Sequence, residues 1–431
     1  MSLIVRRGVS LAFVVTLVVA SAMWGTAPAT AVSIPLATVK PAVASGRLHS
    51  CALRSTGTVV CWGDNTYGEL GNNSIVQSLV PVQVHGVGNK GFLSGVTAMT
   101  AGNGFSCALL STKAVDCWGY GGDGEMGGGS IARSLTPVAV HGVGNRGLLT
   151  NVTAITAANS FACALLVAKT VICWGANDSG QLGIHSNTRA LSPVAVHGVG
   201  NNGQLKGVAA VSAGSSTTPC ALLLAKTVVC WGANVNGELG NNSTSESSVP
   251  TQVRGVGGAG FLSGVKAITG AGANSSCALF SNGGAACWGL KAALGINSSP
   301  GNSLTPVRVH GVDDVGLLAG VTAIVDHSDT PCALLSDGGV DCWGLGINRL
   351  GNSFDGPGVV PVQVHAVGDA GLLSGITSIS AGELVGCAIA TTRAVVCWGD
   401  NGNGELGDGT VANSGRPVQV HGLNDVGFLT L

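Results

Sequence analysis

The stretch CALRSTGTVVCWG, residues 51–63, places two cysteines around a polar Ser-Thr-Gly turn and follows the second cysteine with Trp-Gly. The same pattern returns as CALLSTKAVDCWG, CALLVAKTVICWG, CALLLAKTVVCWG, CALFSNGGAACWG, CALLSDGGVDCWG and CAIATTRAVVCWG. These seven stretches contain all 14 cysteines of the chain and seven of its eight tryptophans. The first cysteines follow one another at intervals of 55 to 57 residues, so the chain consists of seven repeats of one unit.

The composition suits many short strands joined by tight turns. The 431 residues include 69 glycines, while charged residues make up 10% and aromatic residues 4%. Glycine supplies the positive φ angles that such turns require. A formal net charge of −1 offers no electrostatic attraction to nucleic acid or to an anionic membrane surface, so we expect neither as a partner.

The first 31 residues have the pattern of a secretory signal peptide. Arg6 and Arg7 precede a largely apolar stretch, residues 8–24, and Ala-Thr-Ala at 29–31 offers a cleavage site. A membrane anchor is the alternative, but the apolar stretch is short for a spanning helix, which needs about 20 residues. We therefore expect a cleaved signal peptide and a secreted mature chain, residues 32–431, without a membrane span.

Each repeat predicts four antiparallel strands. In the second repeat, residues 96–102 alternate in polarity and end in glycine, and two further short strands, 106–110 and 114–118, flank the turn between the cysteines. A glycine-rich loop then leads to a Pro-Val-x-Val strand at 137–141. Seven such sheets bury both faces and protect their edges when they pack radially. We therefore predict an all-β fold, a seven-bladed β-propeller with four strands per blade.

The two ends of the chain are expected to close the ring. The chain stops soon after the strand at 417–421, and a strand-like segment at 39–46 precedes the first cysteine pair. We predict that the N- and C-terminal strands pair in one blade. An open solenoid is the alternative, but it would need capping repeats with a polar outer face, and the sequence shows none.

The cysteines are expected to form one disulfide within each repeat. With Leu53 opposite Val59, Cys51 lies opposite Cys61, and directly opposed residues on antiparallel strands are roughly 4.5 to 5.5 Å apart at Cα. Zinc is the alternative, but a nine-residue gap matches no zinc-ligand spacing. We expect no metal and no cofactor, and a tryptophan that packs between blades beside each pair. The predicted disulfides are Cys51–Cys61, Cys107–Cys117, Cys163–Cys173, Cys220–Cys230, Cys277–Cys287, Cys332–Cys342 and Cys387–Cys397.

The repeats resemble those of the regulator of chromosome condensation family, whose members form seven-bladed propellers. The resemblance rests on GRLHSCAL at 46–53, TVVCWG at 58–63, NTYGELG at 65–71 and PVQV at 81–84. The paired cysteines are similar to those of an exported bacterial branch of the family. The chain departs from the family pattern in two respects. The histidine of the first motif remains only as His49, and repeats five and six shorten the loop after Trp-Gly to residues 290–294 and 345–350.

The resemblance implies more than one function. A nuclear member promotes guanine-nucleotide exchange on a small GTPase, whereas other relatives act as binding surfaces, including a secreted bacterial inhibitor of β-lactamases. A signal peptide would separate this chain from a cytosolic GTPase, and no residue here matches an exchange site. We therefore expect a monomeric, non-catalytic interaction scaffold for an extracellular protein or cell-surface ligand. An exchange-type regulator and a secreted polysaccharide-active enzyme are the alternatives.

Two sets of repeated polar residues are candidates for chemistry. Symmetry spreads both sets around the ring instead of gathering them at one bond or one ion, so the sequence favours structural roles. Calcium is a further candidate at 64–68 and 400–404, but these loops lack the spacing of oxygen ligands and the terminal glutamate. The glutamates are Glu69, Glu125, Glu238 and Glu405, and the histidines are His85, His141, His197, His310, His365 and His421.

Charged residues are predicted at the tips of the Gly-Val-Gly-Asn loops, which occur once per repeat. The tips are basic in early repeats and acidic in late ones, and the loops of a rigid scaffold carry binding specificity. Ordinary solvation is the alternative explanation of these charges. The candidate binding residues are Lys90, Arg146, Asp313, Asp314 and Asp369.

Overall fold

The computed structural model describes residues 39–431, apart from 215, 271, 298–300 and 354–355. The predicted signal segment, residues 1–31, lies outside the described residues. In the described part of the chain the regular elements are strands and three-residue 3₁₀ segments. No helix there is long and apolar enough to cross a membrane.

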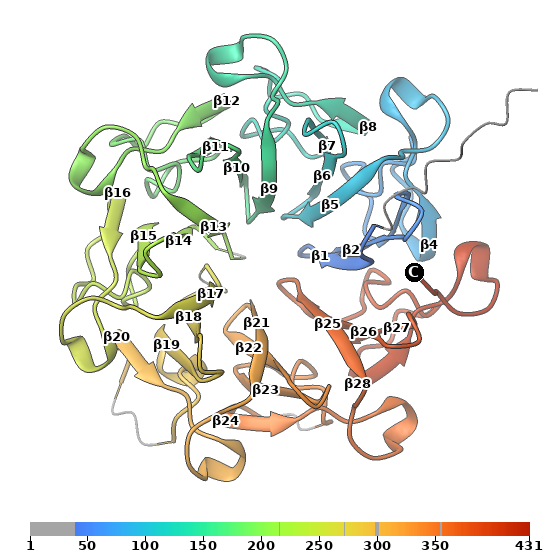
Figure 1. Ribbon diagram of the computed structural model, residues 1–431. Helices are drawn as coiled ribbons and strands as arrows, with labels where there is room; N and C mark the ends of the chain where they lie inside the picture. Colours follow the sequence, from blue (N-terminus) through green and yellow to red (C-terminus); the bar gives the residue numbers. More distant parts are fainter. Residues whose placement is uncertain (1–38, 215, 271, 298–300, 354–355) are drawn as a thin grey trace, which may run out of the picture. The chain divides into compact units, whose positions relative to one another are not determined.

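Twenty-eight strands form seven four-stranded antiparallel sheets in the described residues, and the sheets are arranged as the blades of a ring (Figure 1). The predicted all-β seven-bladed propeller is therefore confirmed. Blades one to three contain β1 Ala42–Ser45, β2 His49–Leu53, β3 Val59–Gly63, β4 Ser78–Gln83; β5 Val96–Ala101, β6 Phe105–Leu110, β7 Val115–Gly119, β8 Ser134–Ala139; β9 Val152–Ala157, β10 Phe161–Leu166, β11 Val171–Gly175 and β12 Ala190–Ala195. Blades four and five contain β13 Val208–Ser212, β14 Cys220–Leu223, β15 Val228–Gly232, β16 Ser247–Gln252; β17 Val265–Ile268, β18 Ser275–Phe280, β19 Ala285–Gly289 and β20 Ser303–Arg308. Blades six and seven contain β21 Val321–His327, β22 Thr330–Leu335, β23 Val340–Gly344, β24 Gly358–Gln363; β25 Ile376–Ala381, β26 Val385–Ala390, β27 Val395–Gly399 and β28 Ser414–Gln419.

The 3₁₀ segments lie in the connections. Seven of them follow the fourth strand of a blade, and η5 follows the third strand of blade five. They are η1 Val87–Asn89, η2 Val143–Asn145, η3 Val199–Asn201, η4 Val256–Gly258, η5 Lys291–Ala293, η6 Val312–Asp314, η7 Val367–Asp369 and η8 Leu423–Asp425.

The first strand of each blade lies at the centre of the ring, where it contacts the first strand of the next blade, and the fourth strand lies at the rim (Figure 1). Because the strands alternate in direction, successive connections leave the sheet at opposite ends. The connection between strands one and two and the long loop between strands three and four leave on one side, here named the long-loop face. The turn between strands two and three and the loop to the next blade leave on the other side, here named the tip face.

The register of the second and third strands places the cysteines opposite each other. In blade one, Leu53 faces Val59 and Cys51 faces Cys61, as predicted. All seven predicted disulfides are present, and the described residues contain no free cysteine. The paired Cα atoms are 4.0 to 4.1 Å apart, closer than expected for directly opposed residues. Every disulfide is buried, so each one belongs to the packing between two blades.

A tryptophan joins each blade to the preceding one. Each indole is buried, and its Nε1 donates a hydrogen bond of 2.7 to 3.0 Å to a backbone carbonyl in the long loop of the preceding blade. The predicted packing role between blades is confirmed. The donors and acceptors are Trp118 and Glu69, Trp174 and Glu125, Trp231 and Gln181, Trp288 and Glu238, Trp343 and Ala293, Trp398 and Arg349, and Trp62 and Glu405.

The predicted pairing of the N- and C-terminal strands is wrong. Blade one is built from β1 to β4 and blade seven from β25 to β28, so each blade is one continuous meander. The segment at 39–46 forms β1, which pairs with β2. Only three residues separate these two strands, and such a short loop costs far less closure entropy than a contact between the two ends of the chain.

The ring closes through the same contact that joins the other blades. Trp62 of blade one donates to the carbonyl of Glu405 in blade seven at 2.8 Å. The last residues of the chain strengthen this junction, because Leu429 and Leu431 are buried in one cluster with Trp62. The N–H of Leu431 also donates to the carbonyl of Arg393, which holds the end of the chain against blade seven.

We expect the disulfides to be found by peptide mapping under non-reducing conditions. Each proteolytic digest should yield only cross-links between cysteines ten residues apart, such as Cys51 with Cys61. Iodoacetamide should label no cysteine in the native protein. A cross-link between blades, such as Cys61 with Cys107, or a labelled native cysteine would contradict the structure.

We expect Trp62→Phe to destabilise the protein as strongly as Trp118→Phe. Both substitutions remove an indole donor and leave a cavity, and in both the buried carbonyl keeps only a serine hydroxyl donor at 3.3 Å, which together cost about 2 kcal/mol or more of unfolding free energy. Urea unfolding followed by circular dichroism measures both losses. The Trp118 variant probes an internal junction, so a much smaller loss for Trp62→Phe would show that blades one and seven are not packed together.

Candidate functional site

The repeated glutamates hold the long loops in place. Glu69 Oε2 accepts a hydrogen bond of 2.8 Å from the N–H of Tyr67, two residues earlier. Glu125, Glu238 and Glu405 accept the equivalent bond in their own loops, at 2.8 to 2.9 Å. In blade three Gln181 takes the same place and accepts the same bond from Ser179. An amide serves this position as well as a carboxylate, which assigns these residues a structural role.

Burial raises the pKa of three of these glutamates, Glu69, Glu125 and Glu405. It raises the pKa of Glu69 to about 7, with a smaller contribution from the charge of Asp64, and it raises the pKa of Glu125 to about 7. Glu125 Oε1 is buried without a hydrogen-bond partner, which also favours the protonated form. The three groups belong to different blades, so no two of them form an acid–base pair at one site.

The loops that resemble calcium loops are organised by asparagine. Asn65 is fully buried, and its Nδ2 donates to the carbonyls of Ser74 and Val76 at 3.0 Å. Its Oδ1 accepts from the N–H of Leu70 at 3.0 Å. Asn401 makes the corresponding bonds in blade seven. The amide therefore takes up the carbonyl oxygens that a cation would need.

The repeated histidines fasten the loops of the tip face. In each case Nδ1 lies 2.5 to 2.6 Å from a side-chain oxygen four residues later, at the end of the 3₁₀ segment. That fourth residue has a positive φ, which asparagine and aspartate tolerate better than most residues. The pairs are His85 with Asn89, His141 with Asn145, His197 with Asn201, His310 with Asp314, His365 with Asp369, and His421 with Asp425.

The five candidate tip residues differ in how they are engaged. Lys90, Arg146 and Asp313 are exposed, and their side chains make no hydrogen bond or ion pair within the described part of the protein. Asp314 is bound to His310, and Asp369 is bound both to His365 and to Arg416, whose Nη1 lies 3.4 Å away. The structure does not bring the five together at one point, because they lie in the loops of four different blades, with Asp313 and Asp314 adjacent in the loop of blade five.

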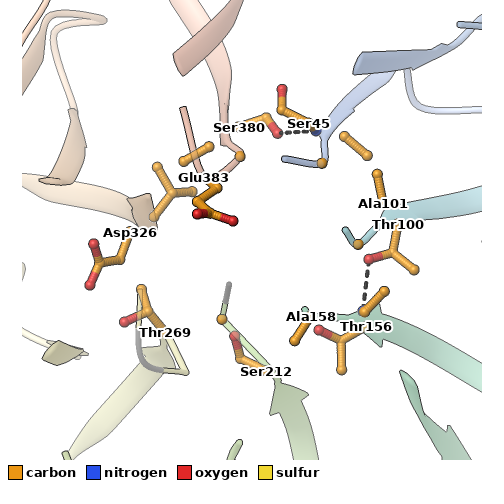
Figure 2. A pocket seen from close by; sticks show the side chains of 18 of the residues that line it. Ser45, Thr100, Ala101, Thr156, Ala158, Ser212, Thr269, Asp326, Ser380 and Glu383 are labelled. Carbon is orange, nitrogen blue, oxygen red and sulfur yellow. Dashed lines mark hydrogen bonds between the residues drawn. The ribbon is translucent and has the colours of Figure 1, made fainter. Parts of the chain in front are cut away.

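A cavity of about 260 Å³ lies at the centre of the ring (Figure 2). The first strands of all seven blades line it, mainly with small side chains such as those of Ala101, Ala158 and Ser212. This cavity was not predicted from the sequence. Its lining residues look unremarkable in any single repeat, and only ring closure brings seven of them around one space.

Hydroxyl groups in the cavity wall link neighbouring blades. Thr100 Oγ1 accepts from the N–H of Ala157 at 2.9 Å, as Figure 2 shows, and Thr156 Oγ1 accepts from the N–H of Ala213 at 3.0 Å. Ser212 and Ser380 serve the junctions of blades four and five and of blades seven and one. The remaining three junctions lack this bond between blades. Ala44 and Val325 stand at the equivalent positions of two of them and have no hydroxyl group. At the third, Thr269 Oγ1 accepts instead from the N–H of Cys277 in its own blade.

Polar side chains gather where the cavity opens toward the long-loop face. Arg47 of blade one forms an ion pair with Glu383 of blade seven, with Nε and Oε2 3.5 Å apart. The carboxyl group of Glu383 points toward the centre of the ring (Figure 2). Asn103 Nδ2 donates to Asn159 Oδ1 at 2.9 Å across the junction of blades two and three. These groups lie in the connections between the first and second strands.

Two buried aspartates mark the junction of blades five and six. Ser275 Oγ lies 2.9 Å from Asp326 Oδ2 and 3.3 Å from Asp329 Oδ1. Asp329 also accepts from the N–H of Asn274 at 2.6 Å. Burial and, to a smaller extent, the charge of Asp329 hold the pKa of Asp326 well above its usual range. Figure 2 shows the Asp326 carboxyl turned away from the centre, so it contributes to the wall between blades.

One sequence signal could have identified the cavity mouth. Arg47 and Glu383 stand where other repeats have asparagine, serine or glycine, and Asp326 stands where others have serine, alanine or glycine. In a repeat protein, a residue found in only one repeat is not required by the common fold.

We expect the stability of the protein to fall between about pH 4.5 and pH 7. The folded state keeps protons on Glu69 and Glu125 up to about pH 7, whereas an unfolded glutamate loses its proton near 4.5. In this window these two groups bind more protons in the folded state, so their contribution makes the unfolding free energy fall as the pH rises. Thermal melting from pH 5 to pH 8 measures this fall.

The double substitution Glu69→Gln/Glu125→Gln provides the control, because Gln181 already fills this position in blade three. We expect a variant that melts at a higher temperature than the parent at pH 8 and depends less on pH. His49 acts in the opposite direction, since burial lowers its pKa to about 4, but it is unchanged in the variant and cancels from the comparison. Parent and variant curves that stay parallel from pH 5 to pH 8 would contradict the assignment.

Comparison with protein families identifies the repeat. Two models described as "Regulator of chromosome condensation (RCC1) repeat" match the chain, and the matched segments together cover just over half of it. One model matches residues 42–69, 96–125 and 376–405. The other matches residues 56–109, 170–221 and 227–279.

Relatives among curated proteins differ in length. The chain is 25% identical over 398 residues to the ultraviolet-B receptor UVR8 of Arabidopsis thaliana, covering 89% of this chain and 82% of the receptor. It is 28% identical over 211 residues to the E3 ubiquitin-protein ligase HERC2 of Homo sapiens. That match covers 49% of this chain and only 4% of the ligase.

Solved structures support the fold. Human WBSCR16 superposes with a TM-score of 0.68 at 22% identity, covering 85% of this chain and 94% of that protein. Prp20p of Saccharomyces cerevisiae superposes with a TM-score of 0.64 at 17% identity, covering 88% and 87%. At these identities the likeness shows the fold alone, and the repeat models supply the family. The chain belongs to the regulator of chromosome condensation (RCC1) repeat family.

Proposed function

We propose that the protein is a secreted, non-catalytic protein-binding module whose partner contacts the tip face. The observation that carries the proposal is the set of charged tips held on rigid loops. Lys90 and Arg146 extend from blades one and two, and Asp313 extends from blade five. Their side chains are exposed, while the loops beneath them are fastened by the histidine contacts.

These charges are distributed asymmetrically over the tip face. The basic tips lie on the neighbouring blades one and two, whereas the acidic tips lie on blades five, six and seven, the last of which adjoins blade one (Figure 1). A partner with complementary charges would bind in one orientation, and exposed charges of this kind chiefly increase the rate of association. The fixed loops lower the entropy cost of binding, because they need not be ordered by the partner.

Relatives with this fold support protein binding as the class of function. The structure of Prp20p is described with its binding properties to Gsp1p and histones, and yeast RCC1 is described bound to Kap60. Secretion is supported by the seven disulfides, which persist in oxidising compartments and are rare in the cytosol. We extend both points to this chain as part of the proposal.

Site-specific photo-crosslinking tests the proposal. A photoreactive amino acid at position 90, 146 or 313 of the oxidised protein, exposed to culture supernatant of the source organism, should capture the same protein from all three positions. The same amino acid at position 73 or 402, in loops of the long-loop face, should not capture it.

Charge reversal then measures the contribution of the tips. We expect Lys90→Glu/Arg146→Glu to weaken binding of the captured protein and to reduce its dependence on salt, without changing the melting temperature. Replacing Glu69, Glu125, Glu238 and Glu405 by glutamine should leave binding unchanged. If the glutamine variant abolishes an activity while the tip variant has no effect, the scaffold function is wrong and an enzyme or ion-binding role replaces it.

A further inference from the structure

Both tyrosines of the chain lie together on the long-loop face. Tyr67 belongs to the long loop of blade one and Tyr120 to that of blade two, and their rings meet edge to face with centroids 4.9 Å apart. Tyr67 is 41% exposed, so part of its ring remains in contact with solvent. The N–H of Tyr120 donates to the carbonyl of Gly104 at 2.7 Å, and Asn103, the residue before Gly104, lines the cavity, so the pair lies near the cavity mouth.

The fold does not require these rings. Residues equivalent to Tyr67 in blades two, three, four and seven are Asp123, Ser179, Asn236 and Asn403, and each still donates its N–H to the loop glutamate or glutamine. Blades three and four place Ala176 and Ala233 at the position of Tyr120. These blades keep the same tryptophan contact, so the aromatic pair is an addition to the common architecture.

Bare backbone lies against the rings. A Cβ atom on Gly122 would stand 2.1 Å from Tyr120 Oη, so only glycine allows the phenol ring to lie there. A Cβ on Gly104 would stand 3.2 Å from the ring of Tyr67 and 3.4 Å from Cβ of Tyr120. Because these two glycines have no side chains, no side chain from either position covers the rings. The two rings form a shallow aromatic surface, here named the platform.

The polar groups around the platform are electrically balanced. Arg189 Nη1 lies 3.3 Å from Asp123 Oδ1 and donates to the carbonyl of Gly122 at 3.3 Å. Burial, followed by the charges of Asp123 and Glu125, raises the pKa of Tyr120 above its ordinary value, so its phenol stays neutral. Asn103, the neighbour of Gly104 in the chain, carries a neutral amide whose Nδ2 donates to Asn159 Oδ1 at 2.9 Å.

We propose that this platform, with the polar groups of Asn103, Asp123 and Arg189 near it, binds a neutral saccharide. The face of an aromatic ring carries negative charge density and attracts the weakly positive C–H groups of a sugar ring. The phenol, amide, guanidinium and carboxylate groups of these residues offer donors and acceptors for sugar hydroxyls. A neutral ligand fits because the local charges already compensate each other. The platform lies on the face opposite the charged tips, so it is a second site that does not rest on the protein-binding function.

Isothermal titration calorimetry with defined sugars tests the proposal. The probes are cellohexaose, xylohexaose, mannohexaose and N-acetylchitohexaose, each titrated into the oxidised protein. We expect at least one of them to bind, and Tyr67→Ala and Tyr120→Ala to weaken its binding about tenfold. Tyr67→Phe should retain most of the affinity, because the ring face is kept. Failure of all four sugars to bind would overturn the proposal.

Matched variants separate this site from the rest of the surface. Phe92→Ala removes an exposed aromatic ring from the tip face, and Lys90→Glu/Arg146→Glu changes the charged tips. Both should leave sugar affinity and its stoichiometry unchanged, and a melting curve should show that each tyrosine variant is folded. Binding that survives both tyrosine substitutions, or a stronger and salt-dependent binding of hexagalacturonate, would place the ligand elsewhere or make it an anion. Either result would contradict the proposal.

Discussion

The hydrogen bond from each tryptophan to the long loop of the preceding blade is the contact on which the ring depends. It is buried, it recurs at every junction, and it fixes the position of a whole blade through one donor and one acceptor. A buried carbonyl that loses its donor costs more than the bond contributes, so the junctions tolerate little variation. The same bond between Trp62 and Glu405 makes the first and last blades neighbours without an exchange of strands.

This contact determines what the other repeated residues do. The carbonyl of Glu69 can meet Trp118 only if the loop around it is held, and the carboxyl group of Glu69 and the amide of Asn65 hold it from within. The carboxyl group is thereby buried, which raises its pKa and makes the stability of the fold depend on pH. The repeated polar residues that resemble catalytic groups in the sequence therefore serve to hold the loops in shape through hydrogen bonds.

Function is therefore expected where a repeat departs from the others. The charged tips differ from blade to blade, while the histidine contacts beneath them are nearly constant. The tyrosine platform occurs at one junction, on the other face. A propeller can carry both because its two faces are built from different connections, and a substitution in one set of loops leaves the other set in place.

The sequence by itself determined the repeat, the four strands of each blade, the disulfide pairs and the packing role of tryptophan. The strands and the disulfide pairs follow from contacts between residues close in the chain, so their spacing reveals them, and the packing role of tryptophan follows from its recurrence beside every cysteine pair. Pairing of the two ends was predicted and is wrong, because a break in the repeat pattern does not show whether the segment at 39–46 pairs forward or backward. The hydroxyl links, the cavity and the contact between Tyr67 and Tyr120 were decided only by the tertiary structure. They join residues about one repeat apart or more, and their geometry exists only when neighbouring blades pack and the ring closes.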